Sequence, residues 1–187
     1  TSQGPAMFAY EVLGSDGNSP ENGASLDAQA LVYYPYTIEG GTELNPSSNF
    51  PDYQIPDGWS AAAWVNTDDA HAVLVVGARS MGETYYGDAR PDDCTIYKGY
   101  HGDPYEPRFL FYDPADLAKV AQGEMQPEQV IPYLEFNPEE YFNESCEWNL
   151  TGAVYDEKNQ LFYVMKRDAY TPDYDPMPLI YVFKVGD

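Results

Sequence analysis

Three short runs of strand-forming residues, separated by turn residues, fill the stretch 150–185. The first run begins at Leu150 and reads Leu-Thr-Gly-Ala-Val-Tyr-Asp, the second begins at Leu161 and reads Leu-Phe-Tyr-Val-Met, and the third begins at Pro178 and reads Pro-Leu-Ile-Tyr-Val-Phe-Lys-Val. Runs of this length, rich in β-branched and aromatic residues, predict β-strands. The same succession of three runs occurs in the stretch 61–112, so the chain is predicted to repeat one antiparallel unit.

The composition favours many short strands over long helices. The 187 residues include 18 Tyr and 8 Phe, whose rings suit half-buried pleated surfaces. The 15 Gly and 16 Pro punctuate the sequence and predict frequent turns. The predicted fold class is therefore all-β, and the length suits a single domain with its own core.

Nine predicted strands can be assigned to four-stranded repeats. The first two strands would end one repeat, the next four would form a complete second repeat, and the last three would begin a third. This count predicts a partial β-propeller of about two to two and a half four-stranded antiparallel blades, forming one portion over 1–187. An irregular β-sandwich is the competing interpretation. The predicted strands begin at Ala6, Ala30, Ala61, Ala72, Arg108, Gln129, Leu150, Leu161 and Pro178.

Two long loops and one short helix interrupt these strands. The stretches 36–59 and 79–107 show no apolar period and are predicted to be irregular loops. A helix is predicted near 114–122, because Asp113 can cap its first backbone N–H groups, Pro114 suits its first position and Gly123 can end it.

Several segments together carry a resemblance to a known group of proteins. The chain resembles the C-terminal half of secreted bacterial β-propeller proteins of uncharacterised function. The resemblance implies a fold and no activity, and it implies that a missing N-terminal segment or a partner chain completes the propeller. The segments that carry it are Gly4-Pro5, Phe8-Ala9-Tyr10, Leu31-Val32-Tyr33-Tyr34-Pro35, Lys98-Gly99-Tyr100-His101, Pro104-Tyr105, Phe111-Tyr112-Asp113-Pro114-Ala115-Asp116-Leu117 and Pro178-Leu179-Ile180-Tyr181-Val182-Phe183.

The charge balance narrows the range of partners. The chain has 31 acidic and 9 basic residues, a net charge of −22. Such a surface repels nucleic acid and anionic membranes, and no apolar run is long enough to span a bilayer. The charge is predicted to keep the surface of a secreted or salt-adapted protein hydrated. Calcium held in acidic loops is the alternative, but no calcium-loop spacing is present, so no metal ligand or cofactor is assigned.

The two cysteines predict the compartment. Cys94 and Cys146 belong to no metal-binding spacing, so one disulfide in an oxidising compartment is predicted, which places the chain outside the cell or in the periplasm. Two unrelated buried thiols are the alternative. Asn143 and Asn149 begin sequons for N-glycosylation, and their use depends on the source of the protein.

The sequence holds no recognisable catalytic constellation. His71 and His101 are the only histidines, and no nucleophile-elbow motif is present, so no catalytic residue is assigned. His71 is expected in an exposed turn, and His101 is expected either to pack within a Tyr-rich loop or to contact a ligand. Aromatic residues in such loops bury a large area on binding. The predicted binding residues are Tyr85, Tyr86, Tyr97, Tyr100, His101 and Tyr105.

These observations predict an extracellular, non-enzymatic binding or assembly module whose Tyr-rich loops form the contact surface. Its predicted partner is a companion polypeptide, either its own missing N-terminal half or a separate chain. The alternative is a propeller-type hydrolase or lyase that acts on polysaccharide with a bound calcium ion. No nucleic acid and no membrane insertion is expected.

Overall fold

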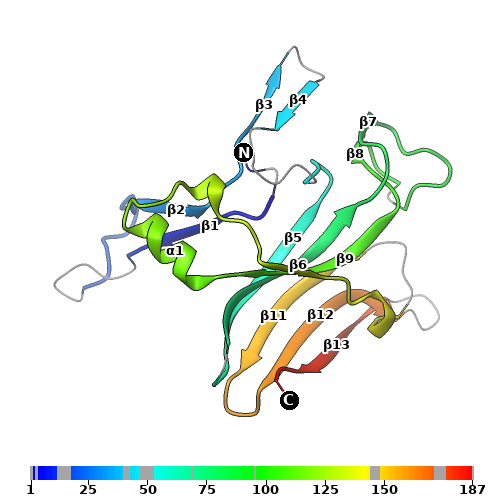
Figure 1. The fold of residues 1–187 in the computed structure, drawn as a ribbon. Coiled ribbons are helices and arrows are strands. Elements are labelled where there is room, and N and C mark those ends of the chain that lie inside the picture. The colour runs from blue at the N-terminus through cyan, green and yellow to red at the C-terminus, as the bar shows by residue number, and fades with distance from the viewer. Residues whose placement is uncertain are drawn as a thin grey trace. The chain divides into compact units, whose positions relative to one another are not determined.

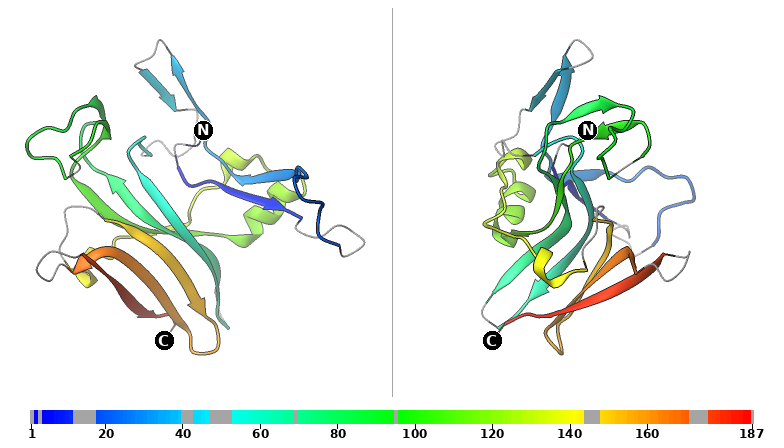
Figure 2. Two further views of the ribbon diagram at one scale, coloured as in Figure 1. Left: turned by 180° about the vertical axis from the view of Figure 1, so that it is seen from behind. Right: turned by 90° about the vertical axis from the view of Figure 1, so that its right-hand side faces the viewer.

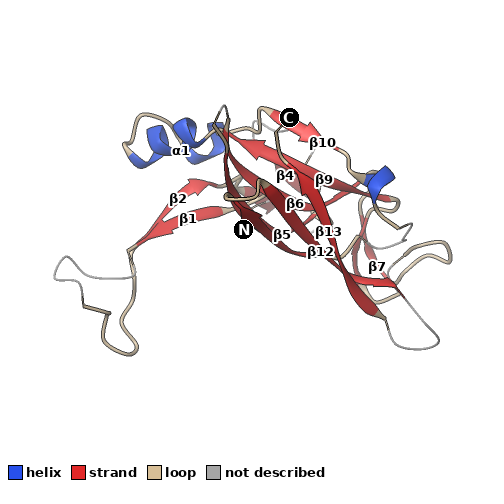
Figure 3. Cartoon of the chain, turned by 90° about the horizontal axis from the view of Figure 1, so that it is seen from below, coloured by secondary structure: helices blue, strands red, loops and turns tan. Residues whose placement is uncertain are grey.

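The computed structural model describes residues 2, 4–11, 18–39, 43–46, 53–68, 70–94, 96–143, 148–170 and 176–186. The chain divides into two compact units. The first consists of Thr1–Asn49 and Ala115–Val130, and the second of Phe50–Pro114 and Ile131–Asp187. Strands make up most of the described secondary structure (Figures 1 and 3).

The first unit contains two hairpins. Strand β1 (Met7–Tyr10) pairs with β2 (Ala28–Val32), and β3 (Tyr36–Glu39) pairs with β4 (Glu43–Pro46), both antiparallel. The β1–β2 pair corresponds to the first two predicted strands. The β3–β4 hairpin corrects the prediction that 36–59 is irregular throughout.

A short helix packs in the same unit. Helix α1 (Pro114–Ala121) is followed by the 3-10 helix η1 (Pro127–Gln129). Gln29 on β2 donates hydrogen bonds from Nε2 to the carbonyls of Val120 (3.2 Å) and Ala121 (3.3 Å) at the end of α1. Gly123 has a φ of 76° just beyond the helix, a conformation that glycine adopts without strain. The predicted helix is therefore confirmed, with its C-terminal carbonyls bonded to a strand.

The second unit is built on a four-stranded antiparallel sheet in the order β10-β9-β6-β5. Its members are β5 (Gly58–Asn66), β6 (His71–Ser80), β9 (Tyr105–Tyr112) and β10 (Leu134–Phe136). The continuous apolar run of β6 is buried from Ala72 to Ala78, so its side chains are covered on both faces of the sheet.

A three-stranded antiparallel sheet follows in chain order. It consists of β11 (Leu150–Asp156), β12 (Leu161–Tyr170) and β13 (Met177–Lys184), and the 3-10 helix η2 (Glu139–Tyr141) lies before it. The first strands of the two sheets, β5 and β11, lie beside one another (Figure 2).

Aromatic rings pack against one another between these two sheets. The Phe109 side chain, 3% exposed, makes edge contacts with the rings of Phe142, Phe162 and Phe183 at centroid distances of 6.3, 5.7 and 5.4 Å. Aliphatic residues of β5, β6, β11 and β12 complete this core: Val65, Leu74, Val76, Ala78, Leu150 and Val164. Edge-to-face ring contacts strengthen such a core beyond the burial of area alone.

The all-β prediction is confirmed, while no closed or propeller arrangement is present among the described residues. Eight of the nine predicted strands begin within three residues of a strand in the structure. The predicted strand at Gln129 is wrong, because η1 ends there and β10 begins only at Leu134. The stretch 79–107 is not wholly irregular, since strands β7 (Tyr85–Gly87) and β8 (Gly99–His101) pair within it.

Candidate functional site

The antiparallel order of the second unit gathers several loops at one end of its sheets. The starts of β5, β9 and β11 and the end of β6 meet there, and the β7–β8 hairpin extends from the same end (Figure 1). The turn between β11 and β12 lies at the opposite end (Figure 1). Segments distant in sequence are thereby brought together, as in many binding sites carried by loops on a rigid sheet.

A pocket of about 200 Å³ opens among these loops. Four aromatic side chains line it: Tyr97, Tyr100, Tyr105 and Trp148. Pro56, Gly58, Ala78 and Asn149 also line it. Among the described residues, the walls carry no lysine, arginine or carboxylate, so these residues offer aromatic faces, hydroxyl groups and one amide to a ligand.

Trp148 joins the pocket to the core. Its indole Nε1 donates a hydrogen bond to the carbonyl of Tyr105 at 2.9 Å, which links the chain before β11 to the start of β9. The Lys166 Nζ lies 4.1 Å from the centroid of the Trp148 ring and donates to the carbonyl of Asn143 at 2.6 Å. Burial lowers the pKa of Lys166 to about 8. The part of the pocket wall formed by Trp148 is thus held by a hydrogen bond and a cation–π contact.

Asp57 fixes the side of the pocket formed by Pro56 and Gly58. Its Oδ2 accepts the backbone N–H of Gln54 at 3.0 Å, and its Oδ1 accepts that of Ser80 at 2.8 Å. Burial raises the pKa of Asp57 to about 6, although the two N–H groups oppose this rise. Burial also raises the pKa of Tyr105 to about 12, with a further contribution from the charge of Asp103.

The β7–β8 hairpin presents two pairs of rings. Tyr85 and His101 are cross-strand partners whose rings stack at 4.9 Å, and Tyr86 and Tyr100 are the next pair, in an edge contact at 4.9 Å. Successive residues of a strand point to opposite faces, so the two pairs lie on opposite sides of the hairpin. Tyr100 lines the pocket, while Tyr85 and His101 face a separate polar cluster.

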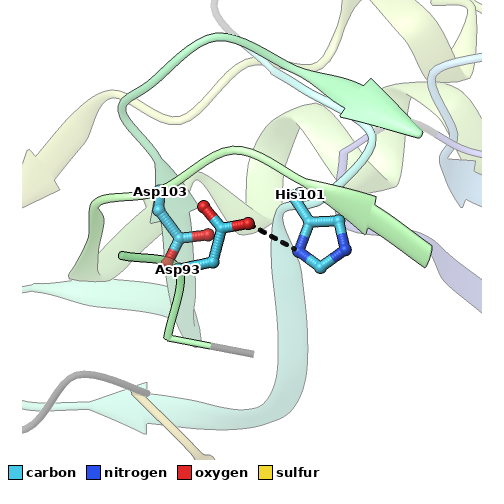
Figure 4. Close-up of side chains that lie close together, drawn as sticks. All are labelled: Asp93, His101 and Asp103. Carbon is cyan, nitrogen blue, oxygen red and sulfur yellow. Dashed lines mark ion pairs between the residues drawn. The ribbon is translucent and has the colours of Figure 1, made fainter. Parts of the chain in front are cut away.

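That polar cluster consists of Asp93, His101 and Asp103 (Figure 4). His101 is fully buried, and its Nδ1 lies 3.6 Å from Oδ2 of Asp93. Asp93 also accepts hydrogen bonds from the Tyr85 hydroxyl and, at 2.6 Å, from the backbone N–H of Arg90. The hydrogen bond from Tyr85 is the main reason that the pKa of Asp93 lies below its usual value, so this carboxyl is ionised near neutral pH.

The six predicted binding residues divide between these two places. Tyr97, Tyr100 and Tyr105 line the pocket. His101 belongs to the polar cluster, and Tyr85 stacks on its ring. Tyr86 is exposed and lies outside the pocket lining. The sequence analysis assigned no role in a site to Trp148, Asp57, Asp93 or Asp103.

The remaining residues singled out from the sequence occupy varied positions. Cys94 is disulfide-bonded, but Cys146 lies outside the described residues, so their pairing stays a prediction. His71 is exposed at the start of β6, where its Nδ1 contacts Oδ1 of Asn66. Asn143 is exposed and Asn149 lines the pocket, and the use of their sequons stays open.

Comparison with known proteins gives no relative: no family model, no curated protein and no solved structure matches the chain. Within the described ranges, no helix has the length and apolar character needed to cross a membrane. The functional assignment therefore depends on the pocket, the polar cluster and the sheets that carry them.

Proposed function

We propose that this chain is an extracellular or periplasmic, non-enzymatic binding module built from blades of the β-propeller type. The observation that supports this most directly is the pocket formed by Tyr97, Tyr100, Tyr105 and Trp148 at the loop end of two packed sheets. Tyr and Trp provide large contact areas at a low cost in side-chain entropy, and they dominate the binding energy of many interfaces.

The order of the strands supports a blade-like architecture. Each of the two larger sheets of the second unit is an antiparallel meander, with the β7–β8 hairpin inserted between β6 and β9. These two sheets pack through their first strands and an aromatic core. Propeller blades are four-stranded meanders of this kind. Two and a half blades cannot close a ring, which agrees with the absence of a closed arrangement among the described residues. The resemblance to secreted bacterial propeller proteins favours the same architecture.

The size and chemistry of the pocket favour a single side chain of a protein partner as its occupant. Its volume of about 200 Å³ lies below the range typical of pockets for whole small-molecule ligands. Its aromatic walls would enclose an apolar or aromatic residue, and the Tyr hydroxyls and Asn149 would bond to the adjacent backbone. The net charge of −22 favours a partner whose surrounding surface is basic.

Selection of phage-displayed random peptides on the immobilised chain tests this proposal. We expect the selected peptides to share an aromatic or large apolar anchor and to bind the chain in solution. Replacing Tyr100 by Ala should weaken binding of a synthetic selected peptide by at least about tenfold, as expected for a hot-spot residue.

Tyr86→Ala is the matched control, because Tyr86 is the cross-strand neighbour of Tyr100 but does not line the pocket. Peptide binding that survives Tyr100→Ala and Tyr97→Ala alike would place the contact surface elsewhere and contradict the proposal.

The outer face of the three-stranded sheet supports a companion polypeptide. Two cross-strand rows lie on this face: Val154, Tyr163 and Val182 form one, and Met165 and Ile180 belong to the next. Val154, Ile180 and Val182 are all more than half exposed. A contiguous apolar patch of this kind marks an interaction surface, and β13 also leaves one edge of its sheet unpaired among the described residues. The proposed occupant is a further β-sheet, from the same longer polypeptide or a separate one.

Light scattering of the purified chain tests for this surface. We expect self-association through the apolar patch, because no described segment of the chain covers it. A stable particle with the 21.0 kDa mass of one chain would count against the need for a companion.

Hydrolysis or cleavage of polysaccharide is the second candidate, and the raised pKa of Asp57 beside the pocket favours it. A carboxyl with a pKa of about 6 can serve as a general acid near neutral pH. Both of its oxygens, however, accept backbone N–H groups, which assigns it to holding the loop. Release of reducing ends from neutral or anionic polysaccharides that is lost in Asp57→Asn, while the variant remains folded, would establish the enzyme instead.

A further inference from the structure

The polar cluster beside the pocket combines one imidazole with two carboxylates. Potential ligand atoms of Asp93, His101 and Asp103 all lie within 4.8 Å of one another. The His101 side chain is completely buried, and the Asp93 side chain is 8% exposed. Figure 4 shows the two carboxylates facing each other, with the His101 ring on the far side of Asp93. Two carboxylates at this separation repel each other unless a cation lies nearby.

The orientation of the His101 ring favours a metal ion as that cation. Its Nε2 lies 3.3 Å from the carbonyl oxygen of Gly87, and since a carbonyl only accepts, Nε2 carries the proton. In the neutral ring, Nδ1 then presents its lone pair toward Asp93. A metal-ligating histidine characteristically donates its other N–H to a carbonyl or carboxylate in this way.

The separation between His101 and Asp93 is also informative. The Nδ1–Oδ2 distance of 3.6 Å exceeds the usual length of a hydrogen bond. Two atoms bound tetrahedrally to a zinc ion at its usual bond lengths lie about 3.4 Å apart. The distance therefore suits a shared metal ion better than a shared proton.

Asp103 provides an independent observation. Its Oδ1 accepts the backbone N–H of Cys94 at 2.8 Å, but its Oδ2 is buried and has no hydrogen-bond partner in the described part of the chain. A buried carboxylate oxygen without a partner is costly, and it calls for an ion or another group at that position.

We propose that Asp93, His101 and Asp103 form a binding site for one divalent transition-metal ion of the zinc class. Imidazole together with carboxylates suits zinc, whereas calcium prefers ligands that are all oxygen. The Tyr85 hydroxyl and the Arg90 N–H orient the Asp93 carboxylate, and the Gly87 carbonyl orients His101.

The ion would tie the two ends of the stretch 93–103 together. Tyr97 and Tyr100, which line the pocket, lie inside this stretch. Metal binding would therefore fix the outer wall of the pocket before a partner arrives, which lowers the cost of ordering it during binding.

Titration calorimetry with Zn²⁺ on chain stripped of metal by a chelator tests the site. We expect one ion per chain, a higher melting temperature in zinc, and weak or no binding of Ca²⁺. His101→Gln and Asp103→Asn should each weaken zinc binding by at least about 100-fold, the upper range reported even for residues that only support ligands. Substituting Co²⁺ gives a visible absorption spectrum that reports a nitrogen ligand, and this spectrum should change in His101→Gln.

Matched controls separate the site from the general acidity of the chain. Asp92→Asn removes the same charge from the residue next to Asp93, and His71→Gln removes the exposed histidine, so both should bind zinc like the unmodified chain. Near-ultraviolet circular dichroism checks that each variant is folded. No stoichiometric zinc binding, equal binding by all variants, or preference for Ca²⁺ would each overturn the proposal.

Discussion

The two larger sheets of the second unit, the four-stranded and the three-stranded one, differ in how their faces are covered. In the four-stranded sheet, β6 has both faces buried from Ala72 to Ala78, and Leu110 on the neighbouring strand β9 is fully buried. In the three-stranded sheet, burial alternates along β13, and Ile180 and Val182 are more than half exposed. The sheets nevertheless share strand order, direction and an aromatic interface.

This difference shows that the same pattern of strands can form one sheet that is buried on both faces and another that is buried on one face only. A strand inside a sheet that is covered on both sides becomes continuously apolar, whereas a strand with one open face alternates. Several exposed residues of the open face, the outer face of the three-stranded sheet, are nevertheless apolar: Val154, Ile180 and Val182. This face is therefore better suited to packing against another sheet than to lasting contact with water.

Phe109→Ala should have the largest effect, because it removes the ring that both sheets share. We expect the free energy of unfolding in urea to fall by about 3–5 kcal/mol, the usual cost of deleting a buried aromatic side chain. Ile180→Ala, on the open face, is the control and should change the value by about 0.5 kcal/mol or less in the isolated chain. Equal losses in both variants would mean that the open face is already packed.

Lys166 makes the stability of the three-stranded sheet depend on pH in the mildly alkaline range. Its pKa is about 8 in the folded chain against an ordinary value of 10.5, so between these values the unfolded chain binds more protons. Stability should therefore rise with pH from about 8 to 10, by at most about 3 kcal/mol. Above that range, the raised pKa of Tyr105 acts in the opposite direction, because its folded form retains a proton that the unfolded form loses.

Urea unfolding of the chain and of Lys166→Met at several pH values measures this effect. The rise should vanish in the variant, since methionine does not titrate. A rise of the same size in Lys166→Met would assign the pH dependence to other groups.

Gly102→Ala should disturb the loop end of the four-stranded sheet. A Cβ at this position would lie 1.8 Å from Oγ of Ser80, which itself donates a hydrogen bond to the Gly102 carbonyl at 2.7 Å. We expect a loss of about 1–3 kcal/mol in the free energy of unfolding, as for other overpacked sites. Gly99→Ala, three residues earlier at the start of strand β8, meets nothing closer than 3.6 Å and should cost less. A greater loss in the Gly99 variant would contradict this account of the packing.

Val182→Lys should have the smallest effect on stability and a clear effect on association. Because Val182 is more than half exposed on the open face, its replacement should change the free energy of unfolding by about 0.5 kcal/mol or less. Light scattering should show less self-association than in the unmodified chain. Unchanged association would show that the open face is not the surface through which the chains associate.

The fold was largely predictable because alternating and continuous apolar runs are local signals. The runs that begin at Leu150 and Leu161 show strand length and character without reference to the rest of the chain. Strand β10 was misplaced, since Pro132 and the apolar residues before it resemble a strand, whereas the pairing with β9 begins only at Leu134. The hairpin β7–β8 was missed because its strands have three residues each and eleven residues separate them.

The site was predictable only in part, because its members meet through the tertiary fold. The density of tyrosines singled out Tyr97, Tyr100 and Tyr105. Nothing near Trp148 in the sequence indicates that it would lie against Tyr105, 43 positions earlier. Among 31 acidic residues, Asp93 and Asp103 are unremarkable until the hairpin brings them to His101.

The position of Trp148 gives the chain an internal optical reporter. Of the three tryptophans, Trp148 is 7% exposed and Trp64 is 59% exposed, so these two should emit at different wavelengths and differ in their access to quenchers such as iodide. The ammonium group of Lys166 lies over the Trp148 ring, so the emission of this tryptophan should change as that group loses its proton near pH 8. Because Trp148 also lines the pocket, a partner that enters should change the same signal, and occupancy becomes measurable without any added dye.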